Sequence, residues 1–191
     1  MEQTLLIVKP DGVQRALSGE IISRLEKAGL KIVGLKMVHA GREMLEKHYT
    51  TSEEFLRGMG GKTLATYKEY GGDVLKEMGT ADELELGKII REWLVDFLSS
   101  GPVIAAVFAG HHAVTQTRKI VGATVPCFAN PGTIRGDYTT DAPDLANAHK
   151  RPVKNLVHAS GSVEEAVAEI ALWFKPEEIM DYERSDEKAR E

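Results

Sequence analysis

The hydrophobic pattern of the first fifty residues switches between the periods of a strand and a helix. Residues 4–9, TLLIVK, form an apolar run that predicts a mostly buried strand, which the following proline and glycine end. Residues 18–28 place apolar side chains three and four apart, which predicts a helix with one buried face and Ser18 as its N-cap. A second strand at 31–40 and a short helix at 42–48 follow. The chain thus begins strand, helix, strand.

The same alternation returns later in the chain. An apolar stripe of Ile90, Trp93, Leu94 and Phe97 predicts a helix with a core-facing side. The continuous apolar run PVIAAVFAG predicts another strand, and HHAVTQTRKIVG a helix that ends near Gly122. This third of the chain is therefore also built from alternating strands and helices.

The last third ends in one more strand and one more helix. NLVHA is strand-like, and Ser162 with Glu165 matches the capping box that starts SVEEAVAEIALWF. Together these elements predict an α/β fold, more narrowly an α+β sandwich. Its layout is ferredoxin-like, βαββαβ, with an antiparallel sheet covered by helices on one side. We expect one domain spanning 1–191.

The periodicity weakens between the two halves, which predicts a helical insertion at about 51–88. Gly58, Gly60 and Gly61 in this region raise the possibility of a phosphate-binding loop. GMGGKT is too short for the P-loop spacing, so a flexible joint is the better interpretation.

Composition and charge limit the function classes. The chain has 42% hydrophobic and 28% charged residues and no apolar run near the roughly 20 residues that span a bilayer, which excludes a membrane-spanning protein. A net charge of -5 argues against a general nucleic-acid surface. The single Cys127 cannot form an internal disulfide, and the N-terminus lacks the layout of a secretory signal, so we expect a cytoplasmic protein.

His158 is the first candidate for chemistry. It lies in the predicted strand NLVHA and is followed by Ala159, Ser160 and Gly161, whose small side chains leave room for a ligand. Imidazole is nucleophilic at neutral pH without a lowered pKa. A phosphate held beside an accessible ring nitrogen can therefore transfer to His158.

Four further side chains lie in loops or at element ends: Lys9, Arg118, Thr124 and Arg135. Each alone is typical of a solvated or ion-paired surface group. If they converge on one pocket, the cations neutralise a polyphosphate, the arginines bind its oxygens bidentately and the threonine adds a neutral donor. In combination with His158 they favour a phosphohistidine enzyme.

Three segments resemble the nucleoside diphosphate kinase family. They are TLLIVKPDGVQRALSGEIISRLEKAGLKIVGLKMV, NPGTIRGDY and NLVHASGSVEEAVAEIALWFKPEE. The resemblance covers roughly 4–49 and 93–182 and leaves the insertion without a counterpart. It implies transfer of the γ-phosphate of ATP to other nucleoside diphosphates, in a ping-pong exchange through a phosphohistidine on His158.

The resemblance also assigns residues. It gives a catalytic set in which Tyr49 steadies the histidine neighbourhood and Ser160 and Glu169 orient the imidazole, and a nucleotide-binding set in which Asn155 contacts the sugar. The catalytic set is His158, Lys9, Tyr49, Ser160 and Glu169, and the nucleotide-binding set is Lys9, Ile90, Arg118, Thr124, Arg135 and Asn155.

The chain departs from the family pattern at three places. Gly161 replaces the family's acid after the serine. Ile90 stands where the family has an aromatic residue for base stacking, and it offers an apolar surface without a π-face. The interval between Arg135 and Asn155 is about ten residues longer than the family's, which predicts a longer loop at about 139–154.

The remaining histidines give no zinc site. His111 and His112 begin a predicted helix, and His39, His48 and His149 are scattered without a third ligand at metal spacing. The metal that the resemblance implies is Mg²⁺, carried by the nucleotide and not by a protein cage. It also implies a homo-oligomer, a hexamer or a tetramer, while hydropathy and net charge lead us to expect no membrane and no specific nucleic-acid partner.

Two other classes stay open. A non-catalytic nucleotide-binding scaffold of the same fold is the main alternative, because the HASGS segment is altered and the insertion is large. A phosphohistidine-dependent hydrolase also uses a nucleophilic histidine but releases phosphate to water. The fate of labelled phosphate from ATP distinguishes all three.

Overall fold

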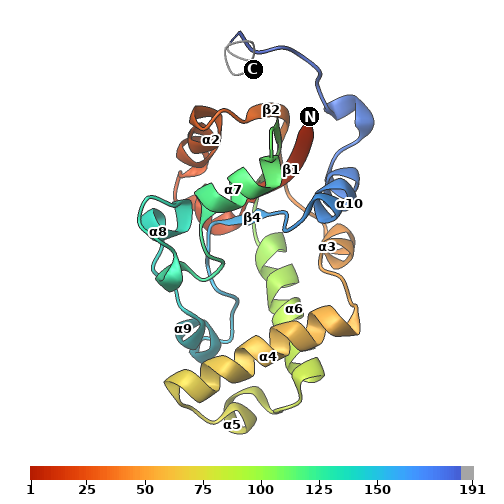
Figure 1. Cartoon of the computed structure of the whole chain (residues 1–191). Helices are drawn as coiled ribbons and strands as arrows, with labels where there is room; N and C mark the ends of the chain where they lie inside the picture. Colours follow the sequence, from red (N-terminus) through yellow and green to blue (C-terminus); the bar gives the residue numbers. More distant parts are fainter. Residues whose placement is uncertain (186–191) are drawn as a thin grey trace.

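A four-stranded antiparallel sheet forms the centre of the computed structural model, which describes residues 1–185 (Figure 1). The strand order β2-β3-β1-β4 places the first strand inside the sheet, paired with β3 on one side and β4 on the other. This arrangement confirms the predicted ferredoxin-like α+β fold. The strands are β1 Glu2–Val8, β2 Lys31–Val38, β3 Val103–Gly110 and β4 Val157–Ala159.

Helices cover both faces of the sheet, so the expectation of cover on one side is wrong. Alternate residues of a strand point to opposite faces. Leu5 and Ile7 of β1 pack in one core with Trp173, whereas Leu6 and Val8 pack in a second core with Ile21. The first core includes side chains of α3 Arg42–His48, α6 Glu83–Ser99 and α10 Val163–Trp173, and the second those of α2 Ser18–Lys27, α7 Ala113–Val121 and α8 Ile134–Tyr138.

Short elements connect these layers, and the start of one helix differs from the prediction. Ser18 is the first residue of α2 and not its cap, which is Leu17 without a side-chain bond. Ser162 caps α10 as predicted, with its hydroxyl accepting from the Glu165 amide. The short elements are α1 Pro10–Gln14 and the 3₁₀ turns Pro126–Phe128 and Pro176–Glu178.

The insertion is helical, as predicted, but the three glycines lie inside a helix and not in a joint. α4 Glu53–Tyr70 runs through all three glycines and packs across α6, with α5 Val74–Met78 beyond it (Figure 1). A Cβ on Gly60 would lie 1.8 Å from the Glu83 carbonyl oxygen, and one on Gly87 would lie 2.0 Å from that of Leu56. Glycine at these two positions lets the helix backbones touch, which fixes the insertion against α6.

The longer segment at 139–154 is only partly a loop. It contains α9, Pro143–Ala148, which begins at a proline and lies against α4. Asp141 accepts two bonds from the Arg151 guanidinium, at 2.6 and 2.8 Å, and a third from the Lys154 amide. These contacts close the segment on itself. Among the described residues no helix is long and apolar enough to cross a membrane.

Candidate active site

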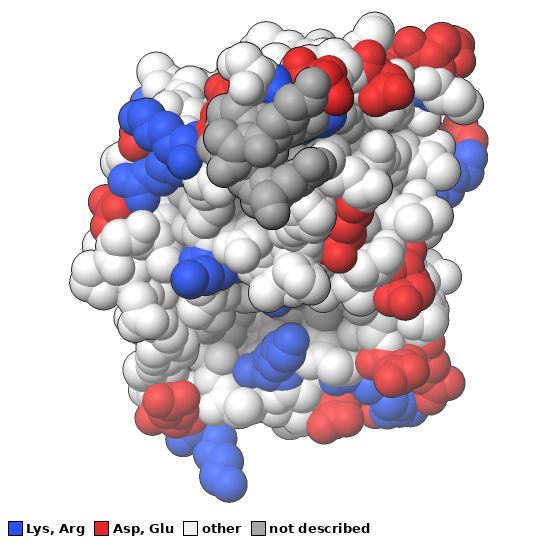
Figure 2. Space-filling view, turned by 45° about the horizontal axis from the view of Figure 1, so that its top comes forward, with Lys and Arg blue, Asp and Glu red and all other residues white. Residues whose placement is uncertain are grey.

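A cavity of about 600 Å³ opens beside the carboxyl end of β1 and the short strand β4. Its lining brings together most of the residues predicted for the site, and Figure 2 shows a hollow on this side of the molecule with lysine or arginine side chains beside it. Ser160 and Glu169 are not in the lining and lie behind His158. The predicted residues in the lining are Lys9, Tyr49, Ile90, Arg118, Thr124, Arg135, Asn155 and His158.

His158 is held from behind by a buried carboxylate. It sits on β4 opposite Ile7 of β1, and its Nε2 lies 2.6 Å from Oε1 of Glu169 on α10. The Ser160 hydroxyl donates to the other carboxylate oxygen at 2.6 Å and accepts from the Leu5 amide. Burial raises the pKa of Glu169, but the bonds and charge of His158 and the bond from Ser160 outweigh it, so the pKa is lowered.

This pairing selects the nucleophilic atom. Nε2 lies 2.6 Å from a carboxylate oxygen that can only accept, so we infer that Nε2 carries the proton and that the lone pair of the neutral ring belongs to Nδ1. No residue of 1–185 bonds Nδ1, and the ring lines the cavity. The geometry therefore presents Nδ1 of His158 to a ligand and uses Glu169 to hold the tautomer.

His48 is a neighbour that the sequence analysis missed. Its ring meets the His158 ring edge-on, with centroids 4.6 Å apart, and its Nδ1 lies 3.6 Å from Glu169 Oε1 and 3.3 Å from the Trp173 indole nitrogen. Burial and the His158 charge lower the pKa of His48 to about 3. Although His48, His158 and Glu169 lie close enough to share a metal ion, the indole N–H directed at His48 Nδ1 occupies that lone pair.

Lys9 and Arg135 are buried cations with extensive hydrogen bonding. Lys9 donates to Oδ1 of Asn155 at 2.8 Å, while Arg135 donates to the carbonyls of Gly122, Asn155 and Val157. Burial and the Arg135 charge lower the pKa of Lys9 to about 8, although Asp11 opposes them. Burial and a neighbouring arginine lower the pKa of Arg135 to about 10. Both groups are therefore destabilised as cations until an anion arrives.

Arg118 and Thr124 form the open side of this cradle. Both are exposed, line the cavity and have no side-chain hydrogen bond within residues 1–185. The Asn155 amide, by contrast, is engaged at both ends, since it also donates to the Thr124 carbonyl at 2.8 Å. Arg118 and Thr124 thus remain available to a ligand, whereas Asn155 shapes the wall.

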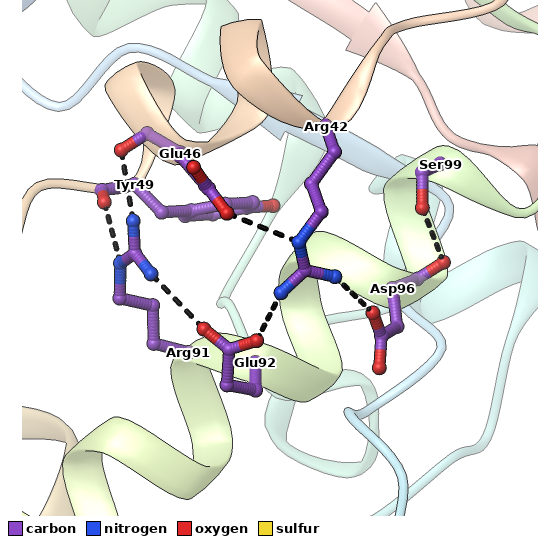
Figure 3. A network of polar contacts seen from close by, with 7 residues as sticks. All are labelled: Arg42, Glu46, Tyr49, Arg91, Glu92, Asp96 and Ser99. Atoms are coloured by element: carbon purple, nitrogen blue, oxygen red, sulfur yellow. Dashed lines mark hydrogen bonds and ion pairs between the residues drawn. The ribbon is translucent and has the colours of Figure 1, made fainter.

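Tyr49 is fixed by a residue absent from the predicted site. Its ring packs edge-on against His48, and its carbonyl accepts from Nε of the buried Arg91 at 2.8 Å (Figure 3). Arg91 also donates to the Glu46 carbonyl at 2.9 Å, so it provides hydrogen-bond donors for main-chain carbonyls at the carboxyl end of α3. Arg42 lies in the same network and bonds Glu46, Glu92 and Asp96. An arginine directly after Ile90, inside the predicted apolar stripe, was the available signal.

The Glu165 carboxylate lies beside Gly161, the position at which the family has an acidic residue. Its Oε2 accepts from the Gly161 amide at 2.7 Å and not from the helix cap, so the reciprocal half of the capping box is wrong. A Cβ on Gly161 would lie 2.5 Å from this oxygen. Glycine and Glu165 therefore occupy this corner of the cavity together.

Comparison with known proteins identifies the same architecture elsewhere. The family model described as nucleoside diphosphate kinase matches residues 2–56 and 85–179. A nucleoside diphosphate kinase of Pyrobaculum aerophilum is 54% identical over 181 residues, which cover 95% of this chain and 99% of that protein. A crystal structure of an NDP kinase from that organism has a TM-score of 0.92, at 53% identity over 94% of this chain and 99% of the other. The enzyme of Borrelia burgdorferi, solved as a transition-state mimic with vanadate and ADP, has a TM-score of 0.78 at 34% identity, over 98% and 95% of the two chains.

Proposed function

Because the chain belongs to the nucleoside diphosphate kinase family, it is a phosphotransferase, and we propose that His158 carries the phosphoryl group between two nucleotides. The observation that supports this most is the 2.6 Å contact between His158 Nε2 and Glu169, which leaves Nδ1 as the atom with a lone pair at the cavity. The relatives' names agree with this chemistry, and the assignment of the residues is our own.

The exchange consists of two half-reactions. The Nδ1 lone pair of His158 attacks the γ-phosphorus of ATP, a nitrogen–phosphorus bond forms, and the bond to the bridging oxygen breaks so that ADP leaves with its electrons. A second nucleoside diphosphate then enters the same cavity, and its terminal oxygen takes the phosphoryl group from nitrogen. The Nε2 proton stays beside Glu169 throughout, which stabilises the charge that develops on the ring.

The cationic cradle matches a polyphosphate. Lys9, Arg118 and Arg135 supply charge, and Thr124 supplies a neutral donor. Glu165 is the one carboxylate among the described lining residues, so the cavity has too few oxygen ligands to bind a free divalent cation. Mg²⁺ therefore fits as part of the nucleotide substrate, where it neutralises phosphate charge, with no protein cage.

The three function classes differ in the fate of the γ-phosphate. After incubation with γ-labelled ATP, we expect acid-labile label on the protein and its transfer to added CDP or GDP. A scaffold would take up no label, and a hydrolase would release it as inorganic phosphate at the same rate with or without an acceptor. Either result contradicts the proposal.

We further propose that the protein acts in the cytoplasm as a homo-oligomer, a hexamer or a tetramer. The single cysteine fits a reducing compartment, and Cys127 is exposed without a disulfide partner. Light scattering after size-exclusion chromatography measures the subunit number directly. A monomer at micromolar concentration would contradict this part of the proposal.

A further inference from the structure

One side of the cavity is closed by the two segments that the sequence analysis marked as additional. α4 contributes Phe55 and Met59 to the lining, α9 contributes Pro143 and Ala146, and the two helices lie in contact (Figure 1). The family model does not match residues 57–84, so most of α4 lies outside it. These apolar side chains form a wall suited to the faces of a planar ring.

Asn147 lies in this wall and differs from its neighbours. It is 9% exposed, it lines the cavity, and its carboxamide has no hydrogen-bond partner within residues 1–185. The main-chain carbonyl of Asn147 accepts hydrogen bonds from the amides of His149 and Lys150 at the end of α9. Its side-chain amide atoms are not among the fully buried polar atoms without a partner, so they face the cavity and are free to bond a ligand group there.

The other asparagine of the lining provides a contrast. Both ends of the Asn155 amide are occupied, by Lys9 Nζ and by the Thr124 carbonyl. The hydroxyl of Thr63, also in the α4 wall, donates to the Met59 carbonyl of its own helix. Asn147 therefore offers an unused acceptor and two unused donors among apolar side chains.

We propose that Asn147 is a specificity-determining residue that hydrogen-bonds the polar edge of the nucleobase. The inference rests on the proposed function, because the cationic cradle must hold the phosphates for the base to reach the wall. A carboxamide can rotate by 180° and exchange its donor and acceptor ends. It can thus pair with a base that has an amino group beside an acceptor or with one that has a carbonyl beside an N–H, which keeps several bases acceptable.

The matched substrates CDP and UDP test this at the C4 group of the base, which is an amino donor in cytosine and a carbonyl acceptor in uracil, while the neighbouring N3 changes from an acceptor to an N–H donor. Calorimetric dissociation constants at pH 8 are measured for the parent, Asn147→Asp, Asn147→Leu and the control Asn130→Asp, an exposed position outside the lining. If Asn147 contacts the C4 group, a carboxylate at 147 can accept from the cytosine amino group but is repelled by the uracil carbonyl, so Asn147→Asp should raise the preference for CDP over UDP about tenfold. Asn147→Leu should weaken both about fivefold and leave ribose 5-diphosphate, which has no base, unchanged.

An unchanged CDP to UDP ratio in Asn147→Asp overturns the proposal, as does an equal loss of affinity for ribose 5-diphosphate in Asn147→Leu. A shift of the same size in Asn130→Asp would also overturn it, because the effect would then be long-range charge. Binding is measured without phosphoryl transfer. If the Asn147 variants show the predicted shifts but the parent protein never labels His158 with ATP, only the proposed function is contradicted.

Discussion

The His48 ring meets the His158 ring edge-on, with centroids 4.6 Å apart and ring planes 78° from parallel. His48, the last residue of α3, lies between Tyr49 and Trp173 of α10, and both rings contact the ring that touches the proposed nucleophile. Because burial keeps His48 neutral, it supports His158 without competing for the Glu169 carboxylate. A second cation in this place would repel the charge that develops on His158.

The lowered pKa of His48 predicts acid sensitivity. Its folded pKa is about 3 and its ordinary value 6.5, so between these values the unfolded chain binds a proton that the native protein does not. The stability linked to this group is present above pH 6.5 and is lost as pH falls through that window, at up to about 1.4 kcal/mol per pH unit. Urea unfolding of His48→Phe should give a flatter dependence than the parent between pH 6 and pH 4, and the exposed control His39→Phe should match the parent. Equal slopes for the parent and His48→Phe contradict a buried neutral His48.

The lowered pKa of Lys9 predicts the pH dependence of nucleotide affinity. With a pKa of about 8 in the free protein, Lys9 loses its charge above that pH, and a bound polyphosphate raises the pKa again. The dissociation constant of ADP should therefore rise about tenfold between pH 7 and pH 9, as expected for one group of this pKa. Lys9→Gln should bind more weakly with little change over this range. If the variant retains the full pH dependence, another group is responsible.

Arg91 should support activity through the carboxyl end of α3. Removing its bonds to the Tyr49 and Glu46 carbonyls frees the turn that carries His48 and Tyr49. We expect Arg91→Met to lose about 2 kcal/mol of stability and to lower kcat at least tenfold at a temperature where it is fully folded, with a smaller change in KM. Arg42→Met removes an exposed arginine of the same network and should leave kcat within twofold. Equal kcat values for the two variants would limit Arg91 to a structural role.

The glycines of α4 allow a matched test of how the insertion packs. Gly60→Ala places a methyl group on the Glu83 carbonyl and should cost about 1 to 3 kcal/mol, seen as a lower melting temperature. A Cβ on Gly58 meets nothing within 4 Å, so Gly58→Ala should stabilise the helix by about 1 kcal/mol. A stable, fully active Gly60→Ala would show that α4 can move away from α6.

The catalytic neighbourhood was accessible from sequence because its residues sit at fixed points of the fold. Lys9 follows a strand that a proline and a glycine end, and His158 lies in a strand and is followed by small residues, so the hydrophobic pattern and the turn residues locate both. The structure gives Arg135 a role that the motif did not show. Three of its N–H groups hold main-chain carbonyls. Neutralising it should therefore reduce stability as well as turnover.

The sequence-based predictions that were wrong or incomplete concern contacts between segments far apart in the chain. Three glycines in GMGGKT indicate a joint by local propensity, but two helices in backbone contact require glycine and override it. The stripe of Ile90 and Leu94 faces the cavity, whereas Arg91, Val95 and Leu98 are the buried side of α6. The location of His48 beside His158 follows from α3 packing against α10, which no local pattern encodes.

The central claim is that Nδ1 of His158 receives the phosphoryl group because Glu169 holds Nε2. The direct measurement is phosphorus NMR with tandem mass spectrometry of protein quenched in alkali after incubation with ATP, because both assign the residue and the ring nitrogen. We predict one phosphorylated residue, His158, substituted at Nδ1, and no such signal in His158→Ala with its fold intact by circular dichroism. Phosphate at Nε2, or on any other residue at the rate of turnover, would contradict the account.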